Sequence, residues 1–396
     1  MKNFLPSLTA LILSISASAE IPEGAIPFIL DSHVYIQATL CDTVPVSIIY
    51  DSGADRLYLD KDYMALSDLE KQPFRKGKAR MGGAGNDGAQ TIPIIIDEIP
   101  MTMGKVVHKE KITPIINLRE IIGRWTDGMI GNNAVFNRSL IINYSGGYLL
   151  PVDDITPDML KEYTKIPAQF NDNRIDIEGE LRIDSVQTLK GTFRLDIGCG
   201  STVILTHAAL KKLNLEAKPK VRSYYSAYGV GGDGTDINFR ADSFAFLDTL
   251  TNIVISASQN DRGALSERNH LGVFGNDIIS HYDWIIDAPH NTIYAKRNGN
   301  LKDDYRHSTK TGLGYTDRTD ICDGWIVSAL YEKSKAKNAG FEIGDIILSV
   351  NDRPVKDISW EEQRNGLHLT GPTKYQVRKA DGSIVTYTID IKEEML

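Results

Sequence analysis

Pro45-Val-Ser-Ile-Ile-Tyr-Asp51-Ser52-Gly53 is an apolar stretch that runs into a turn, and the chain repeats this pattern once. The second copy reads Gly191-Thr-Phe-Arg-Leu-Asp196-Ile197-Gly198. Runs of β-branched and aromatic residues that end in Asp and Gly are typical of a strand followed by a tight turn. Each copy therefore predicts a strand that presents an aspartate at its end.

Three further landmarks follow each aspartate at nearly equal distances. A glycine-rich stretch lies about 32 residues after Asp51 and about 33 residues after Asp196. A glycine preceded by two apolar residues lies 80 residues after the first aspartate and 79 after the second, and an apolar strand ends at 92 and 91 residues. Four landmarks in one order indicate a duplicated unit. A single Asp-Ser-Gly is typical of a surface turn, and the alternative for the whole series is two unrelated β-hairpins.

This series resembles aspartic proteases, and its Asp-Ser-Gly-Ala form is similar to retropepsins. The resemblance covers about residues 30 to 297 and implies a mainly β fold of two lobes, with Asp51 and Asp196 as a catalytic dyad. The residues that it implies as supports of the dyad loops are Ser52, Gly53, Ile197, Gly198, Ile130, Gly131, Phe274 and Gly275. The glycines that it implies for two flap-like hairpins are Gly82, Gly83, Gly85, Gly229, Gly231 and Gly232.

The chemistry of such a dyad explains why the two aspartates come from separate lobes. Two carboxyl groups that share a proton cannot both ionise cheaply, so one acts as a base and the other as an acid. The base activates a water that attacks a peptide carbonyl, and this needs no metal or cofactor. Ala54 and Cys199 follow the two loops and stabilise the charged form only weakly. We therefore expect activity towards neutral pH.

Ile197 departs from the family pattern. The residue after the catalytic aspartate is normally Ser or Thr, whose hydroxyl bonds the opposite loop, and Ile197 has none. A catalytically inactive, peptide-binding or scaffold protein is therefore the alternative to an aspartic endopeptidase. A further alternative is that lobes of two chains pair through Asp51 alone.

The C-terminal segment resembles a PDZ domain. Thr311-Gly312-Leu313-Gly314-Tyr315 is similar to the Gly-Leu-Gly-Phe loop, and the series around Gly340, Gly344-Asp345 and Asn351 is similar to PDZ domains of bacterial proteases. The resemblance implies that the backbone amides of residues 312–315 bind a peptide carboxylate while the peptide adds as a strand. A PDZ fold whose groove is filled, and which only packs on the protease, is the alternative.

The start of the chain and its composition indicate where the protein acts. Residues 1–19 carry one lysine, an apolar run and Ala-Ser-Ala, which predicts a cleaved signal peptide and a periplasmic or secreted protein. The rest of the sequence contains no run of about 20 apolar residues, so we expect no stable membrane insertion. The net charge of -8 argues against a nucleic-acid partner. The resemblance to aspartic proteases implies a peptide or protein substrate.

These signals divide the chain into six segments. They are a signal peptide (1–19), an N-terminal lobe (20–150), an inter-lobe segment (151–173), a C-terminal lobe (174–297), a linker (298–311) and a PDZ domain (312–396).

Overall fold

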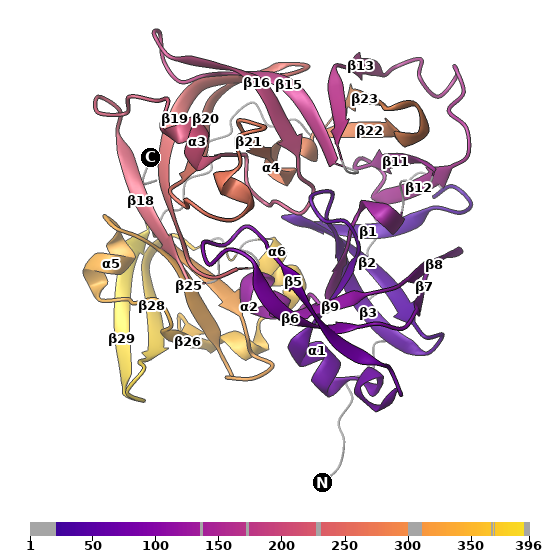
Figure 1. The fold of residues 1–396 in the computed structure, drawn as a ribbon. Helices are drawn as coiled ribbons and strands as arrows, with labels where there is room; N and C mark the ends of the chain where they lie inside the picture. Colours follow the sequence, from indigo (N-terminus) through magenta and orange to yellow (C-terminus); the bar gives the residue numbers. More distant parts are fainter. Residues whose placement is uncertain are drawn as a thin grey trace.

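The computed structural model describes residues 21–134, 138–171, 174–226, 231–299, 311–365, 367 and 369–391. The predicted signal peptide, Gly229 and residues 300–310 of the predicted linker lie outside the described residues. The described chain is mainly β, as the sequence predicts. Figure 1 shows three parts: a first half in indigo and purple, a second half from magenta to orange, and a C-terminal domain from orange to yellow.

In its described residues, the first half consists mainly of short strands with two short α-helices. Its strands are β1 (Ile26–Asp31), β2 (His33–Leu40), β3 (Val44–Tyr50), β4 (Leu57–Asp60), β5 (Lys76–Met81), β6 (Gln90–Ile95), β7 (Ile99–Met103), β8 (Val106–Glu110), β9 (Thr113–Ile116), β10 (Gly128–Ile130), β11 (Ser139–Asn143) and β12 (Tyr148–Val152). Its helices are α1 (Lys61–Leu66) and α2 (Leu118–Ile122). The Asp60 carboxylate begins α1 by accepting hydrogen bonds from the backbone of Asp62 and Tyr63, which satisfies two amides that a helix leaves unpaired.

The second half is built in the same way. Its strands are β13 (Thr164–Ile166), β14 (Ala168–Asn171), β15 (Arg174–Arg182), β16 (Thr188–Leu195), β17 (Val203–Leu205), β18 (Lys220–Tyr225), β19 (Gly234–Ala245), β20 (Thr249–Ser258), β21 (Gly272–Phe274), β22 (Tyr282–Asp287) and β23 (Thr292–Arg297). Its helices are α3 (His207–Leu210) and α4 (Asn276–Ile279). Strands β13 and β14 lie within the segment 151–173, which the sequence analysis treats as a connection.

The two halves share one strand order. In the first half the order is β3-β10-β4-β9-β6-β5. The pairs β3–β10 and β4–β9 are parallel, and the pairs β10–β4, β9–β6 and β6–β5 are antiparallel. In the second half the order is β16-β21-β17-β20-β19-β18. The pairs β16–β21 and β17–β20 are parallel, and the pairs β21–β17, β20–β19 and β19–β18 are antiparallel. Equal parallel and antiparallel steps at equal places mean that the sequence repeat is also a repeat of structure.

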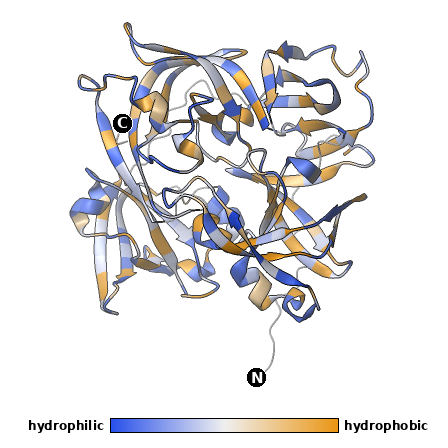
Figure 2. Ribbon diagram, viewed as in Figure 1, coloured by the Kyte–Doolittle hydropathy of each residue, from blue (hydrophilic) through white to orange (hydrophobic). Residues whose placement is uncertain are grey.

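A shared sheet and a shared core join the halves. Strand β11 pairs with β22, so one sheet runs from β13 and β23 across to β12 and β1. The largest apolar cluster contains buried residues of both halves, including Tyr50, Leu195, Phe274 and Trp284. Figure 2 shows hydrophobic and hydrophilic residues alternating along many of these strands, as expected when one face of a strand is buried. The halves are therefore fixed against each other by burial.

The C-terminal domain has its own core. It contains β24 (Leu313–Asp317), β25 (Trp325–Tyr331), α5 (Lys335–Ala339), β26 (Ile346–Val350), β27 (Arg353–Pro354), α6 (Trp360–Arg364), β28 (Gly371–Arg378) and β29 (Ile384–Ile391). Its apolar cluster is separate from that of the two halves and is centred on Trp325, Phe341 and Val377. Such a separate core is what a domain of its own needs.

The C-terminal domain contacts both halves. Strand β25 pairs with β18 of the second half, with Ser223 opposite Tyr331 and Tyr225 opposite Ala329 (Figure 1). Towards the first half, the buried Arg318 guanidinium donates to Asp62 at 2.5 Å. The sheet of the second half therefore continues into the C-terminal domain.

Within the described residues, the helices are all too short or too polar to cross a bilayer.

Candidate active site

The two aspartates that the sequence singles out occupy equivalent places. Asp51 follows β3 and Asp196 follows β16, and each of these strands pairs in parallel with a three-residue strand. The Asp51 amide donates to the Ile130 carbonyl at 3.0 Å, and the Asp196 amide donates to the Phe274 carbonyl at 3.1 Å. The short strands β10 and β21 therefore fix where each aspartate leaves its sheet. Gly131 and Gly275 follow them against the backbone of the aspartate loops, where a side chain would clash.

The structure brings the two carboxyl groups together. Their side chains are hydrogen-bonded to each other. A Cβ atom added to Gly53 would lie 3.1 Å from Asp51 Oδ1 and 3.2 Å from Asp196 Oδ1, so both groups converge beside this glycine. A Cβ atom added to Gly198 would overlap the Asp51 carboxylate. A side chain at Gly198 would therefore displace the Asp51 carboxylate, and one at Gly53 would crowd both carboxyl groups.

Burial and mutual repulsion make the two carboxyl groups unequal. Burial, and next the negative charge of Asp51, raise the pKa of Asp196 to about 8. Burial also raises the pKa of Asp51, but hydrogen bonds from the Gly53 and Ala54 amides, at 2.7 and 3.2 Å, oppose this by stabilising its charged form. Asp51 is therefore the member that ionises first, and Asp196 keeps the proton that the pair shares.

Ser52 holds the two aspartate loops together. Its hydroxyl, which is fully buried, donates to the Leu195 carbonyl at 2.8 Å and accepts from the Ile197 amide at 2.9 Å. The Ile197 side chain is buried in the shared core and offers no hydroxyl for the reverse bonds. Half of the reciprocal clasp that the family resemblance implies is thus present.

Two asparagines, which the sequence analysis did not single out, hydrogen-bond to the backbone of the two aspartate loops. Asn132 Nδ2 donates to the Ser52 carbonyl at 2.8 Å, and Asn276 Nδ2 donates to the Ile197 carbonyl at 2.6 Å. The hydroxyls of Tyr50 and Tyr144 donate in turn to the two amide oxygens, at 2.8 and 2.7 Å. The signal was in the sequence, because each asparagine directly follows the glycine of its repeat.

His33 is a further residue that the sequence analysis did not assign to this site. Backbone groups of Gly198, in the second aspartate loop, and of Asp31 both lie within hydrogen-bonding reach of its ring. Burial lowers the pKa of His33 to about 4, so the ring is neutral at neutral pH. The contact with Gly198 links the second aspartate loop to the first half. Ile197, in the same loop, supplies no hydroxyl for such a link.

The predicted flap glycines lie in two hairpin loops that contact each other. Gly82, Gly83 and Gly85 lie between β5 and β6, and Gly231 and Gly232 lie between β18 and β19. The Asp87 amide donates to the Gly231 carbonyl at 2.7 Å, and Gly85 lies so close to Gly231 that a side chain there would overlap its backbone. The loops of the two halves therefore meet directly.

The neighbouring groups give little support to metal or thiol chemistry. Among the described residues, no three His, Cys, Asp or Glu side chains are placed to hold a metal ion. Burial strongly raises the pKa of the Cys199 thiol, and the charge of Asp196 raises it further. The Cys199 thiol is therefore protonated at neutral pH and is a poor nucleophile.

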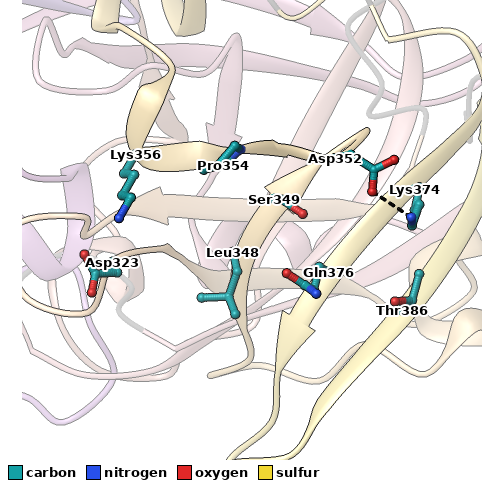
Figure 3. Close-up of a pocket in the computed structure, with 9 residues that line it drawn as sticks. All are labelled: Asp323, Leu348, Ser349, Asp352, Pro354, Lys356, Lys374, Gln376 and Thr386. Atoms are coloured by element: carbon teal, nitrogen blue, oxygen red, sulfur yellow. Dashed lines mark hydrogen bonds and ion pairs between the residues drawn. The ribbon is translucent and has the colours of Figure 1, made fainter.

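The C-terminal domain carries a separate hollow of about 380 Å³ on the face of β26 and β28. Figure 3 shows Lys374 paired with Asp352 at its edge, with Ser349 and Gln376 on its floor. None of its residues belongs to the aspartate loops, so it lies apart from the candidate site.

The predicted carboxylate-binding residues lie at the start of this domain. Leu313 begins β24, a bulge separates Gly314 from Tyr315, and the Tyr315 ring stacks on Trp325 with centroids 4.4 Å apart. The Leu313 amide donates to Thr311 Oγ1 at 3.2 Å. One of the amides predicted to bind a carboxylate is therefore hydrogen-bonded within the loop in this structure.

Comparison with known proteins identifies this last domain. A family model described as PDZ domain matches residues 326–361, which run from β25 into α6. No curated protein matches the chain. The match confirms the PDZ part of the sequence prediction. This chain therefore carries a PDZ domain, a module that binds peptides or proteins.

Proposed function

We propose that the protein is an aspartic endopeptidase in which Asp51 and Asp196 form the catalytic dyad. The observation that carries this proposal is the meeting of two half-buried, hydrogen-bonded carboxyl groups from matching loops of a duplicated fold. In this mechanism the ionised Asp51 takes a proton from a water that attacks the peptide carbonyl. Asp196 donates its proton to the carbonyl oxygen and stabilises the charge that develops there.

The PDZ domain would recruit or position the substrate. It contacts both halves of the chain and pairs through β25 with the hairpin strand β18. A peptide held there would therefore be tethered to the molecule that cleaves it, which raises its local concentration. We also propose that the protein is exported to the periplasm or outside the cell, on the evidence of residues 1–19.

Ile197 favours a second candidate, a peptide-binding or scaffold protein without turnover. The missing hydroxyl removes half of the clasp between the loops, which would leave the dyad less rigid. Against this, Asn276 and His33 both bond the backbone of the second loop. These bonds supply a different means of fixing the dyad.

The test compares three variants of the mature chain on an unfolded protein substrate that carries a quenched fluorophore. Asp51→Asn and Asp196→Asn should each abolish cleavage, because each removes one member of the pair. The control is Asp261→Asn, at an exposed aspartate, which should cleave at the wild-type rate. Cleavage that survives either dyad variant contradicts the proposal. A wild-type chain that does not cleave the substrate favours the scaffold protein. A measurement of molecular mass in solution tests the further alternative, in which the lobes of two chains pair through Asp51.

A further inference from the structure

The outer edge of β24 is covered at its C-terminal end, around Asp317, by residues 123–125 of the first half, which we name the docked segment. Within the described residues, β24 pairs with one strand, β25. The Arg318 amide donates to the Gly324 carbonyl on the β25 side at 3.1 Å. In a strand, the backbone N–H and C=O of successive residues point to opposite edges. The Asp317 carbonyl therefore points away from β25, to the outer edge of β24. There it accepts a hydrogen bond from the Arg124 amide at 2.9 Å.

Side chains hold the docked segment between β24 and α6. Arg124 Nε lies 3.6 Å from Asp317 Oδ2, and the Arg124 guanidinium covers the Trp125 ring at 4.1 Å. The Trp125 ring stacks on Trp360 of α6, with centroids 5.6 Å apart and planes inclined by 13°. Gln363 of α6 donates to Asp317 Oδ2 at 2.9 Å, so the helix stands beside this end of the strand. The docked segment thus fills the space between strand and helix.

The close approach depends on Gly123. This residue has a φ of 109°, a conformation that favours glycine, and it ends helix α2. A Cβ atom there would lie 3.4 Å from the Asp317 carbonyl oxygen. The backbone of the first half is therefore brought directly against the strand edge.

We propose that the docked segment occupies the distal end of the PDZ groove, and that a peptide with a free C-terminal carboxylate competes with it for β24. PDZ domains bind such peptides as an added strand, with the carboxylate at the loop that begins the strand. From residues 312–315 the peptide would run along β24 towards Asp317, whose carbonyl is already taken by Arg124. Peptide binding and docking of the first half therefore exclude each other. This inference rests on the PDZ domain and stands whether or not the dyad cleaves peptides.

Two substitutions at one position isolate the contact. Arg124→Ala removes the guanidinium and keeps the amide that donates to Asp317. Arg124→Pro removes both, because proline has no backbone N–H, and the preceding Gly123 already has the extended ψ of 174° that proline favours. The probe is a set of fluorescein-labelled heptapeptides with randomised last four residues and a free carboxylate, selected for binding to the mature Arg124→Pro chain. Fluorescence anisotropy then gives the dissociation constants of the selected peptides for all three chains.

Competition predicts an order of affinities. Arg124→Pro should bind about fivefold more tightly than Arg124→Ala, the effect of one net hydrogen bond, and Arg124→Ala more tightly than the wild type. The same peptides with an amidated C-terminus should bind at least tenfold more weakly. Equal dissociation constants for the three chains, equal binding of the amide, or the absence of any selected peptide would each overturn the proposal.

A second measurement covers the case in which Arg124→Pro fails to fold, as judged by circular dichroism. Trp125→Ala removes the stack on Trp360 and should also bind the peptides more tightly than the wild type, whereas Tyr163→Ala, an aromatic deletion in the second half, should not. In the wild type, a saturating peptide should increase amide hydrogen exchange in residues 123–125. Binding that leaves this exchange unchanged would show that the peptide does not displace the docked segment.

Discussion

Replacing Asp196 with asparagine should remove the pH dependence that this carboxyl group gives to folding. Burial and the charge of Asp51 raise the pKa of Asp196 from its ordinary value of 3.8 to about 8 in the folded protein. Between these two values the folded chain carries a proton that the unfolded chain has released. The stabilisation that goes with this proton is fully present below the unfolded pKa, and it is lost as the pH rises through the folded pKa.

The magnitude follows from one proton. A group that is protonated only in the folded state lowers the free energy of unfolding by about 1.4 kcal/mol for each pH unit. Asparagine does not titrate, yet its amide can still donate to Asp51. We therefore compare the free energies of unfolding of Asp196→Asn and the wild type. The variant's value minus the wild type's should increase by about 1.4 kcal/mol for each pH unit, and by roughly 3–4 kcal/mol between pH 5 and pH 8.

Urea unfolding at pH 5, 6, 7 and 8, followed by tryptophan fluorescence, measures this difference. Asp261→Asn, an exposed aspartate, serves as the control and should differ from the wild type by the same small amount at every pH. Wild-type and Asp196→Asn stabilities that run parallel across the range would refute the reasoning, because the folded protein would then hold no extra proton at this site.

Two further predictions concern the same loops. Ser52→Ala should lower the free energy of unfolding by about 1–3 kcal/mol in the urea assay, because it leaves the buried Ile197 amide and Leu195 carbonyl without their shared partner; a smaller change would mean that water or a backbone shift replaces the hydroxyl. If the chain is a protease, its pH-rate profile should still be high at pH 7 and fall above about pH 8, where Asp196 loses its proton; a maximum confined to strongly acid conditions would contradict the protonation states assigned to the pair.

The sequence carried enough information to predict the repeat. Asp51 and Asp196 lie 145 residues apart, yet equal spacing of the glycines and apolar strands after each pointed to equivalent loops. That signal works because a duplicated backbone needs glycine wherever the chain passes close to itself, as it does at Gly131 and Gly275. The mainly β fold followed from the same strands.

The supports of the site were harder to predict, because they depend on contacts between distant parts of the chain. His33 reaches the loop of Gly198 only when β2 of the first half lies against the second half. Likewise, no local pattern tells that Trp125 will stack on Trp360, a residue 235 positions later. The sequence repeat predicted that Asp51 and Asp196 occupy equivalent loops, but contacts between distant parts of the chain decide which neighbours hold these loops.

The pairing of β18 with β25 has a consequence for shortened forms of the protein. A chain that ended before residue 311 would leave the backbone of residues 223–225 without the strand that now pairs with it. Exposed strand edges recruit strands from other molecules, so such a fragment should self-associate and lose solubility. In the full chain this edge is paired with β25, so we expect the PDZ domain to protect the rest of the molecule from self-association.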